Sequence, residues 1–184
     1  MRRPWFSKPY ADAVARLRVP LGFIMVAAFA WFSAPDARSL AWGLPVAAVG
    51  LLLRGWAAGH LEKNRTLATG GPYAYVRNPL YIGTATVAAG LAIASRRWEL
   101  AALFGAAFVL VYLPAIELEE QHLRKLFPEY AEYAARVPML LPRFSAHGGI
   151  GSFRWSIYRR NQEYQALAGL LGGAVLLVWK AWRG

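Results

Sequence analysis

Runs of apolar residues alternate with short polar stretches along most of the chain. An α-helix needs about 20 mostly apolar residues to cross a hydrocarbon core about 30 Å thick. Five segments approach that length: 15–34, 39–59, 80–95, 98–116 and 165–182. The pattern therefore predicts an all-α polytopic membrane protein with about five transmembrane helices. A buried soluble helical bundle is the alternative, but so many apolar runs leave too little polar surface to cover a soluble fold.

The connections between these segments carry further information. The third and fourth segments are separated only by Arg96 and Arg97, so their spacing predicts a tight helical hairpin. The fifth segment carries Gly169, Gly172 and Gly173, small residues that allow a neighbouring helix to approach closely. The first run follows a basic N-terminus, as in a signal peptide, but the runs behind it favour a retained first span.

Composition narrows the class of protein. With 184 residues, 57% of them hydrophobic, the chain is expected to form a single integral membrane domain over 1–184. It has no cysteine, which excludes disulfides, thiolate metal sites and a cysteine nucleophile. His60, His122 and His147 lack metal-ligand spacing, so no metal site is expected. The net charge of +11 does not indicate a nucleic-acid partner, because the basic residues lie between apolar runs.

The distribution of basic residues predicts an orientation. With the N-terminus in the cytoplasm, 15 of the 21 basic residues fall on the cytoplasmic side. The other side holds Arg38, Arg96, Arg97, Lys180 and Arg183, and Arg54 lies inside a span. The positive-inside rule therefore predicts a cytoplasmic N-terminus and an external C-terminus. This topology places both long polar segments, 60–79 and 117–162, on the cytoplasmic face, where S-adenosylmethionine or NADPH is available.

The first polar segment contains two turns close to the start of an apolar run. Gly70-Gly71-Pro72 predicts one turn and Asn78-Pro79 another, and a proline can begin a helix without losing a needed donor. The first N–H groups of such a helix can receive an anionic or polar ligand. The alternative is an interfacial loop in which tyrosines lie at the headgroup level and Arg77 contacts lipid phosphate. Spacing alone leaves both interpretations open.

The second polar segment is expected to continue the fourth span as a helix. Glu120 and Arg124 are four residues apart, and Glu117 lies one turn earlier, near the membrane boundary. A carboxylate there can receive the amino group or ribose hydroxyls of a nucleoside cofactor, or it can orient an arginine. The alternative is a solvated amphipathic helix with ordinary surface pairs. The aromatic residues that follow, at helical spacing, are more often packing residues than a cofactor site.

Together, the two polar segments resemble the isoprenylcysteine carboxyl methyltransferase family, to which the phospholipid N-methyltransferases are related. The resemblance rests on His60, Gly71-Pro72-Tyr73-Ala74-Tyr75-Val76-Arg77-Asn78-Pro79-Leu80-Tyr81-Ile82-Gly83, Glu119-Glu120-Gln121-His122-Leu123, Tyr130, Tyr133, Arg136-Val137-Pro138 and Leu141-Pro142. It covers about residues 40–144, which would form the methyltransferase-like core. Residues 145–184 would then be a C-terminal extension that contains the fifth span.

The resemblance implies a multi-pass membrane enzyme that transfers a methyl group from S-adenosylmethionine to a lipid or prenylated acceptor. The cofactor would be bound on the cytoplasmic side by His60, Tyr73, Arg77, Asn78, Pro79, Tyr81, Gly83, Glu117, Glu119 and Glu120. The catalytic residues would be Arg77, Glu120 and Arg136. The acceptor would enter the site sideways from the surrounding membrane lipids.

One departure from the family pattern bears on the acceptor. The family usually has histidine where this chain has Asn78, and an asparagine side chain cannot take up a proton near neutral pH. Methyl transfer from a sulfonium mainly requires desolvation and alignment, which can supply roughly 7–11 kcal/mol. A carboxylate acceptor is already ionised, whereas an amine would have to lose a proton. Asn78 therefore favours a carboxylate, which Arg77 or Arg136 could hold.

Other functions share part of this signature. A phospholipid amine N-methyltransferase is one alternative. Sterol reductases resemble the same Arg-x-Pro-x-Tyr block and use NADPH, but they are usually much longer than 184 residues. A non-enzymatic membrane protein that binds lipid headgroups through its tyrosines and arginine is a third. A second departure, Phe127-Pro128 where Phe-Gly is common, does not separate these classes.

Overall fold

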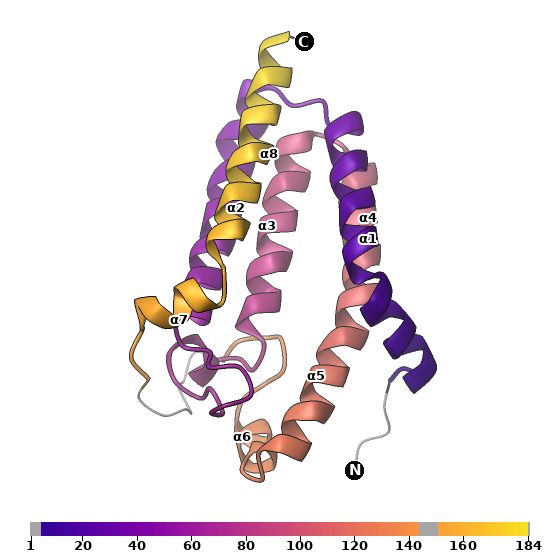
Figure 1. The fold of residues 1–184 in the computed structure, drawn as a ribbon. Coiled ribbons are helices and arrows are strands. Elements are labelled where there is room, and N and C mark those ends of the chain that lie inside the picture. The colour runs from indigo at the N-terminus through magenta and orange to yellow at the C-terminus, as the bar shows by residue number, and fades with distance from the viewer. Residues whose placement is uncertain (1–4, 144–150, 184) are drawn as a thin grey trace. The chain divides into compact units, whose positions relative to one another are not determined.

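The computed structural model describes residues 5–143 and 151–183, except for the side chains of residues 15, 18 and 19, and every regular element in these ranges is helical. The elements are α1 (Lys8–Phe32), α2 (Ala37–Ala58), the 3₁₀ helix η1 (Gly71–Ala74), α3 (Pro79–Ser95), α4 (Trp98–Ala107), the π-helical turn η2 (Phe108–Tyr112), α5 (Leu113–Leu126), α6 (Tyr130–Arg136), α7 (Trp155–Arg160) and α8 (Tyr164–Arg183) (Figure 1). The all-α prediction is confirmed.

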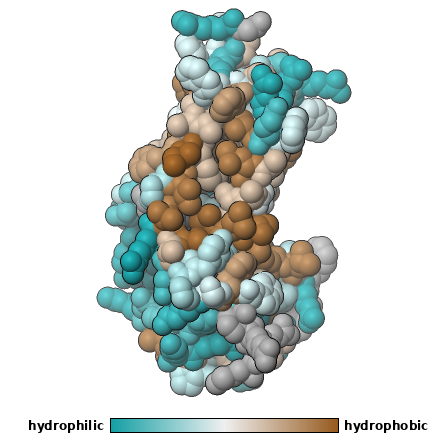
Figure 2. Space-filling model, turned by 90° about the vertical axis from the view of Figure 1, so that its right-hand side faces the viewer, coloured by the Kyte–Doolittle hydropathy of each residue, from teal (hydrophilic) through white to brown (hydrophobic). Residues whose placement is uncertain are grey.

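Three helices are long and apolar enough to cross a membrane. They are α2, the continuous helix Trp98–Leu126 and α8, while Pro20–Phe32 and Pro79–Ser95 form shorter apolar helices. Large apolar side chains such as Trp31 (82% exposed) and Leu52 (73% exposed) point outward, as expected for surfaces that face lipid. Figure 2 shows hydrophobic residues gathered along the helical part of one face and hydrophilic ones toward its ends. The chain is therefore a membrane protein.

Contacts within the chain gather in two compact units. Unit 1 comprises residues 1–47, 88–120 and 171–184, and unit 2 comprises 48–87 and 121–170. The helices α2, α3, α5 and α8 each contribute residues to both units.

The core of unit 1 lies where the ends of several helices meet. Phe29, Ala94, Leu100 and Leu177 are buried together there. The ring of Phe29 lies 6.2 Å from that of Phe104, which places α1 against α4 (Figure 1). This core therefore joins elements that are far apart in sequence by burying apolar side chains of α1, α3, α4 and α8.

The tight hairpin predicted between the third and fourth segments is confirmed. Helix α3 ends at Ser95 and α4 begins at Trp98, and Arg96 adopts a left-handed conformation with φ 55°. Arg96 Nη1 also donates to Asp36 Oδ2 at 2.7 Å. The backbone N–H of Ser39 donates to the same carboxylate, and this bond lowers the pKa of Asp36. The hairpin is thus tied to the connection between α1 and α2.

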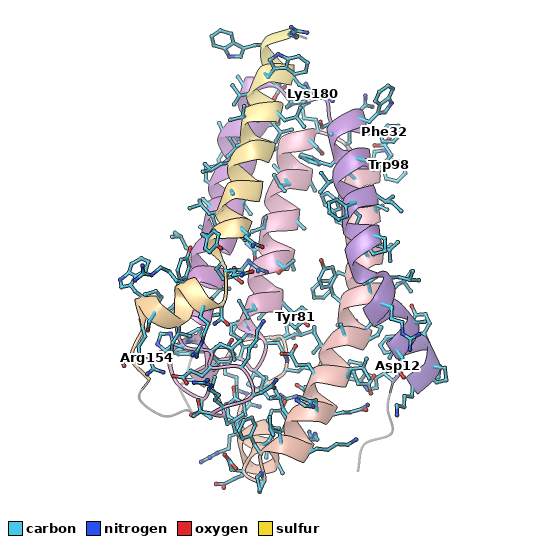
Figure 3. All side chains as sticks on the ribbon, viewed as in Figure 1. Asp12, Phe32, Tyr81, Trp98, Arg154 and Lys180 are labelled. Atoms are coloured by element: carbon cyan, nitrogen blue, oxygen red, sulfur yellow. The ribbon has the colours of Figure 1, made fainter. Side chains whose placement is uncertain are left out.

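Basic side chains complete the C-terminal end of α1. Lys180 Nζ donates to Ala30 O at 2.9 Å, to Trp31 O at 3.2 Å and to Ser33 Oγ at 3.1 Å (Figure 3). Arg97 Nε donates to Phe32 O at 3.2 Å. The last carbonyls of a helix have no partner within the helix, and cations there also interact favourably with its dipole. These two basic residues, which the charge count assigned to the external side, therefore have local structural partners.

The π-helical turn in the fourth span has a local cause. Pro114 has no N–H to donate to the carbonyl of Leu110, four residues earlier. The hydroxyl of Tyr10 donates to that carbonyl instead, at 2.7 Å. The N-terminal helix therefore supplies the hydrogen bond that the proline removes from η2 and α5.

Glycines allow close approach of α2 and α3. A Cβ at Gly50 would lie 2.6 Å from the Val87 nitrogen and 2.7 Å from the Gly83 oxygen, both backbone atoms. By contrast, among the described residues, no atom apart from the adjacent residues and the backbone of α8 itself lies within 4 Å of a Cβ placed at Gly169, Gly172 or Gly173. Close packing on small residues, which the sequence indicated for the fifth span, is therefore found between α2 and α3 instead.

Gly50→Ala should lower the free energy of unfolding by about 1–3 kcal/mol, because the added methyl group meets backbone atoms that cannot rotate away. Gly172→Ala is the matched control: it adds the same methyl group to open space, and should be neutral or stabilising by up to about 1 kcal/mol. Both values can be measured by unfolding the purified protein in mixed micelles. Equal destabilisation by the two substitutions would contradict the α2–α3 contact.

Candidate functional site

The two sequence blocks that carry the resemblance lie against each other in unit 2. The hydroxyl of Tyr133 donates to Tyr73 O at 2.8 Å. Two backbone bonds run beside it, from Arg77 N to Pro138 O at 2.9 Å and from Arg143 N to Tyr75 O at 3.1 Å. The 3₁₀ helix η1 is thereby fixed to α6 and to the residues that follow it.

Arg77 and Asn78 reinforce this junction with their side chains. Arg77 Nη1 donates to Ala134 O at 2.8 Å and to Val137 O at 2.9 Å. Since α6 ends at Arg136, these carbonyls belong to the end of the helix and need outside donors. Asn78 is buried, and its Nδ2 donates to Met139 O at 3.2 Å. Both side chains therefore hold the second block in place. The amide of Asn78 does so as a hydrogen-bond donor that does not change its protonation state.

Aromatic residues form the core under this junction. Tyr130, Tyr133 and Val137 are buried together, with Leu67, Leu123, Phe127 and Ala134 packed against them. The rings of Tyr130 and Tyr133 meet edge to face at 5.9 Å, and the Arg124 guanidinium lies 5.3 Å from the Tyr130 ring centre. The aromatic residues of the second block thus serve packing, as their helical spacing indicated.

His60 lies just beyond the end of α2, packed against the glycine turn. Its Nδ1 is 2.9 Å from Trp56 O and its Nε2 is 3.2 Å from Gly151 O. Gly71 has φ 58°, and a Cβ there would lie 2.6 Å from His60 Nε2. Only glycine satisfies both the backbone conformation and the close approach of the imidazole ring.

A polar depression of about 250 Å³ opens beside His60. One side is formed by Glu62 and by the turn from Thr66 to Gly70, and the other by Gly151, Ser152, Arg154 and Ile157. Glu62 pairs with Arg154, and Arg160 Nη2 lies 3.7 Å from its Oε2. The sequence pattern predicts no catalytic or binding role for residues after 144. The aromatic and arginine run Phe153-Arg154-Trp155 is the signal that could have drawn attention to them.

Two further predicted residues have clear structural roles in α3. Pro79 is fully buried at the first position of the helix, where its missing N–H costs nothing. Gly83 lies in the close contact with α2, since a Cβ there would be 2.8 Å from Gly50 O. Tyr81 is partly buried on the first turn of the same helix (Figure 3). Packing alone therefore accounts for Pro79 and Gly83, and their cofactor roles stay predictions.

The predicted carboxylates belong to the part of α5 that lies in unit 1. Glu117 accepts the backbone N–H groups of Trp5 at 2.8 Å and Phe6 at 3.3 Å, and so ties the N-terminal residues to α5. Glu119 is exposed and Glu120 is buried. Because carboxylates are seldom buried, Glu120 does not fit the alternative of an ordinary solvated surface pair.

Arg136, the third predicted catalytic residue, lies at the end of α6 in unit 2. Its Nη2 is 3.3 Å from Glu132 Oε1, four residues earlier, and more than half of each side chain is exposed. Such a pair contributes little to stability. The guanidinium is therefore accessible from outside the fold.

Comparison with known proteins matches the same region. Residues 47–130 match the family model of the phospholipid methyltransferases. This family includes the isoprenylcysteine carboxyl methyltransferases, so the match supports the broader group without selecting that branch. It covers the glycine turn, the tight hairpin and α5. Residues 47–130 are thus similar to a family of membrane methyltransferases.

Two curated relatives match with similar strength. The cobalt-zinc-cadmium resistance protein CzcN of Cupriavidus metallidurans is 36% identical over 118 residues, 63% of this chain and 52% of that protein. The nickel-cobalt-cadmium resistance protein NccN of Alcaligenes xylosoxydans xylosoxydans is 36% identical over 117 residues, 62% of this chain and 54% of that protein. The chain therefore spans about half the length of these relatives. No solved structure matches it.

Proposed function

We propose that this protein transfers a methyl group from S-adenosylmethionine to a lipid-embedded acceptor, preferably a carboxylate. The observation that carries the proposal is the match of residues 47–130 to the phospholipid methyltransferase family. Support comes from the hydrogen bonds of Arg77, Asn78 and Tyr133, which join the residues after the glycine turn to α6 and to Met139 beyond it. Such a rigid junction is suited to alignment, which is the main requirement of an in-line methyl transfer.

Under this proposal the residues have distinct roles. The cofactor-binding residues are His60, Tyr73, Arg77, Asn78, Pro79, Tyr81, Gly83, Glu117, Glu119 and Glu120. Arg77, Glu120 and Arg136 are the catalytic residues, and Arg136 supplies an accessible guanidinium that can pair with an acceptor carboxylate. Asn78 provides hydrogen bonds but no proton transfer, which disfavours an amine acceptor. Isoprenoid and other lipid acids are therefore proposed as methyl acceptors in preference to phospholipid amines.

The first test is cofactor choice. Isothermal titration of the purified protein should show binding of S-adenosylhomocysteine and none of NADPH. Mass spectrometry of lipid extracts, incubated with the protein and isotopically labelled S-adenosylmethionine, should then show one labelled methyl group on an acidic lipid. Binding of NADPH instead would indicate a reductase, and binding of neither nucleotide would indicate a non-enzymatic lipid-binding protein.

We further propose five spans with a cytoplasmic N-terminus. The chain has no cysteine, so single cysteines can be labelled without background. Lys63→Cys and Arg38→Cys both replace exposed residues, and they should lie on opposite sides of the membrane. A membrane-impermeant maleimide should label Arg38→Cys in intact cells and Lys63→Cys only after permeabilisation. Labelling of both in intact cells, or the reverse pattern, would contradict this topology.

A further inference from the structure

The segment 151–163 is fixed to the end of α2 although it lies outside the family match. Arg154 N donates to Gly59 O at 3.0 Å, and Asn161 Nδ2 donates to Ala58 O and Leu61 O, each at 2.8 Å. These carbonyls end α2 and need outside donors. The segment therefore forms one wall of the depression beside His60.

The ends of two candidate spans place this wall at the membrane boundary. The span α2 ends at Ala58, where the contacts of the wall begin, and the span α8 begins at Tyr164, directly after Glu163. Residues that directly follow or precede a transmembrane helix lie at the level of the lipid headgroups. The depression thus opens at that level.

The outer side of the wall is aromatic. The Trp155 ring lies 5.1 Å from the Phe153 ring and 5.5 Å from the Tyr158 ring, both edge to face. Trp155 is 67% exposed, whereas Ile157 is only 4% exposed and anchors α7 to unit 2. Exposed tryptophan and tyrosine rings beside a span are typical of the interfacial layer of a membrane, where the ring contacts lipid and its polar atom contacts water.

The inner side of the wall is polar and carries excess positive charge. The Glu62 carboxylate pairs with Arg154, which lines the depression and is labelled in Figure 3, and Arg160 Nη2 lies 3.7 Å from the same carboxylate. Arg159, the residue before Arg160, is exposed. Unit 2 as a whole contains eleven basic and four acidic residues. Hydroxyl groups of Thr66, Thr69 and Ser152 line the same depression and can donate to an anion.

We propose that this depression binds the phosphate headgroup of an anionic phospholipid from the surrounding membrane. Arg154 and Arg160 provide the charge, the hydroxyl groups contact the phosphate oxygens, and the acyl chains follow Phe153 and Trp155 into the bilayer. The site requires no methyl transfer, and of the proposed cofactor-binding residues it is lined by His60 alone. A bound lipid there would fix the C-terminal extension to the end of α2.

The test is native mass spectrometry of the full-length protein in a neutral detergent, with phosphatidylglycerol or phosphatidylcholine of the same chain length added. Wild-type protein should retain phosphatidylglycerol preferentially. Arg159→Gln/Arg160→Gln removes two positive charges near the headgroup and should weaken that retention by roughly 10- to 30-fold. Arg124→Gln/Lys125→Gln is the matched control, because it removes the same charge from exposed positions on α5 and should leave retention unchanged.

A second variant tests the depression itself. Ser152→Tyr fills it from an exposed position, and should reduce retention while the binding of S-adenosylhomocysteine is preserved. Equal retention of the two lipids, or equal losses in the two charge variants, would overturn the proposal. Displacement of phosphatidylglycerol by S-adenosylhomocysteine would also overturn it, because the depression would then be a cofactor site. Competition by millimolar glycerol phosphate would show a site for free phosphate esters.

Discussion

Arg77→Ala is expected to lower the rate of methyl transfer at least about 100-fold, the size of loss that follows a displacement of about 1 Å in a catalytic arrangement. The Arg77 guanidinium holds the carbonyls of Ala134 and Val137, so its removal frees the end of α6 from the glycine turn. Arg77→Lys should keep more activity than Arg77→Ala, since a single nitrogen, Nη1, donates to both carbonyls and an ammonium group also has several donors. The measurement is the initial rate with labelled S-adenosylmethionine.

Arg136→Ala is the matched comparison for this result. It removes an arginine from the same junction, but its side chain is more than half exposed and pairs only with Glu132 among the contacts described. If it only holds the acceptor, the substitution should raise KM and leave the binding of S-adenosylhomocysteine intact, whereas Arg77→Ala should weaken both. Full activity in Arg77→Ala would remove the site assignment altogether.

Glu120→Ala should also abolish methyl transfer while the protein stays folded. Glu120 is a buried carboxylate on the helix Trp98–Leu126, beyond its apolar part, and carboxylates are seldom buried without a structural or functional reason. Glu119→Ala gives a control on the neighbouring position, which is exposed, and its effect should be smaller. Comparable rates in wild type and Glu120→Ala would show that this carboxylate only supports the helix.

Local chemistry made several features of the fold predictable from the sequence. Only Arg96 and Arg97 separate the third and fourth apolar segments, and this spacing predicted the hairpin, because so short a connection requires a tight turn between the two helices. Pro79 gave the start of α3, since proline supplies the helical φ and needs no partner for nitrogen. The family resemblance grouped Tyr73 and Arg77 with Tyr133 and Val137 in one sequence pattern, and in the structure hydrogen bonds join Tyr133 to Tyr73 and Arg77 to Val137.

Long-range partners could not be predicted in the same way. Nothing in the local sequence shows that the Glu117 carboxylate accepts N–H groups from Trp5 and Phe6, more than 100 residues away. The positive φ and close imidazole contact of Gly71 likewise depend on the position of His60 in space. Arg54 is the clearest case, because the sequence showed only an isolated arginine inside a span.

Arg54→Met is expected to lower the free energy of unfolding by about 3–5 kcal/mol, the usual cost of breaking a buried ion pair. Arg54 Nε and Nη2 donate to the two carboxylate oxygens of Glu163, at 3.1 and 2.8 Å, and Nη1 donates to Thr84. Glu163 is only 9% exposed, so the substitution would leave its charge buried without this partner. Unfolding in mixed micelles, followed by circular dichroism, measures the loss.

The double variant Arg54→Met/Glu163→Met tests whether the ion pair itself adds stability. The alternative is that stability is lost only when one of the two charges stays buried without the other. Removing both charges restores an apolar contact between α2 and the start of α8, and should recover most of the lost stability. The exposed pair of Arg96 and Asp36 is the control, since breaking it should change stability little. A double variant as unstable as the sum of its single variants would show that Arg54 and Glu163 act separately, and that the extension is not held to α2 by their charge.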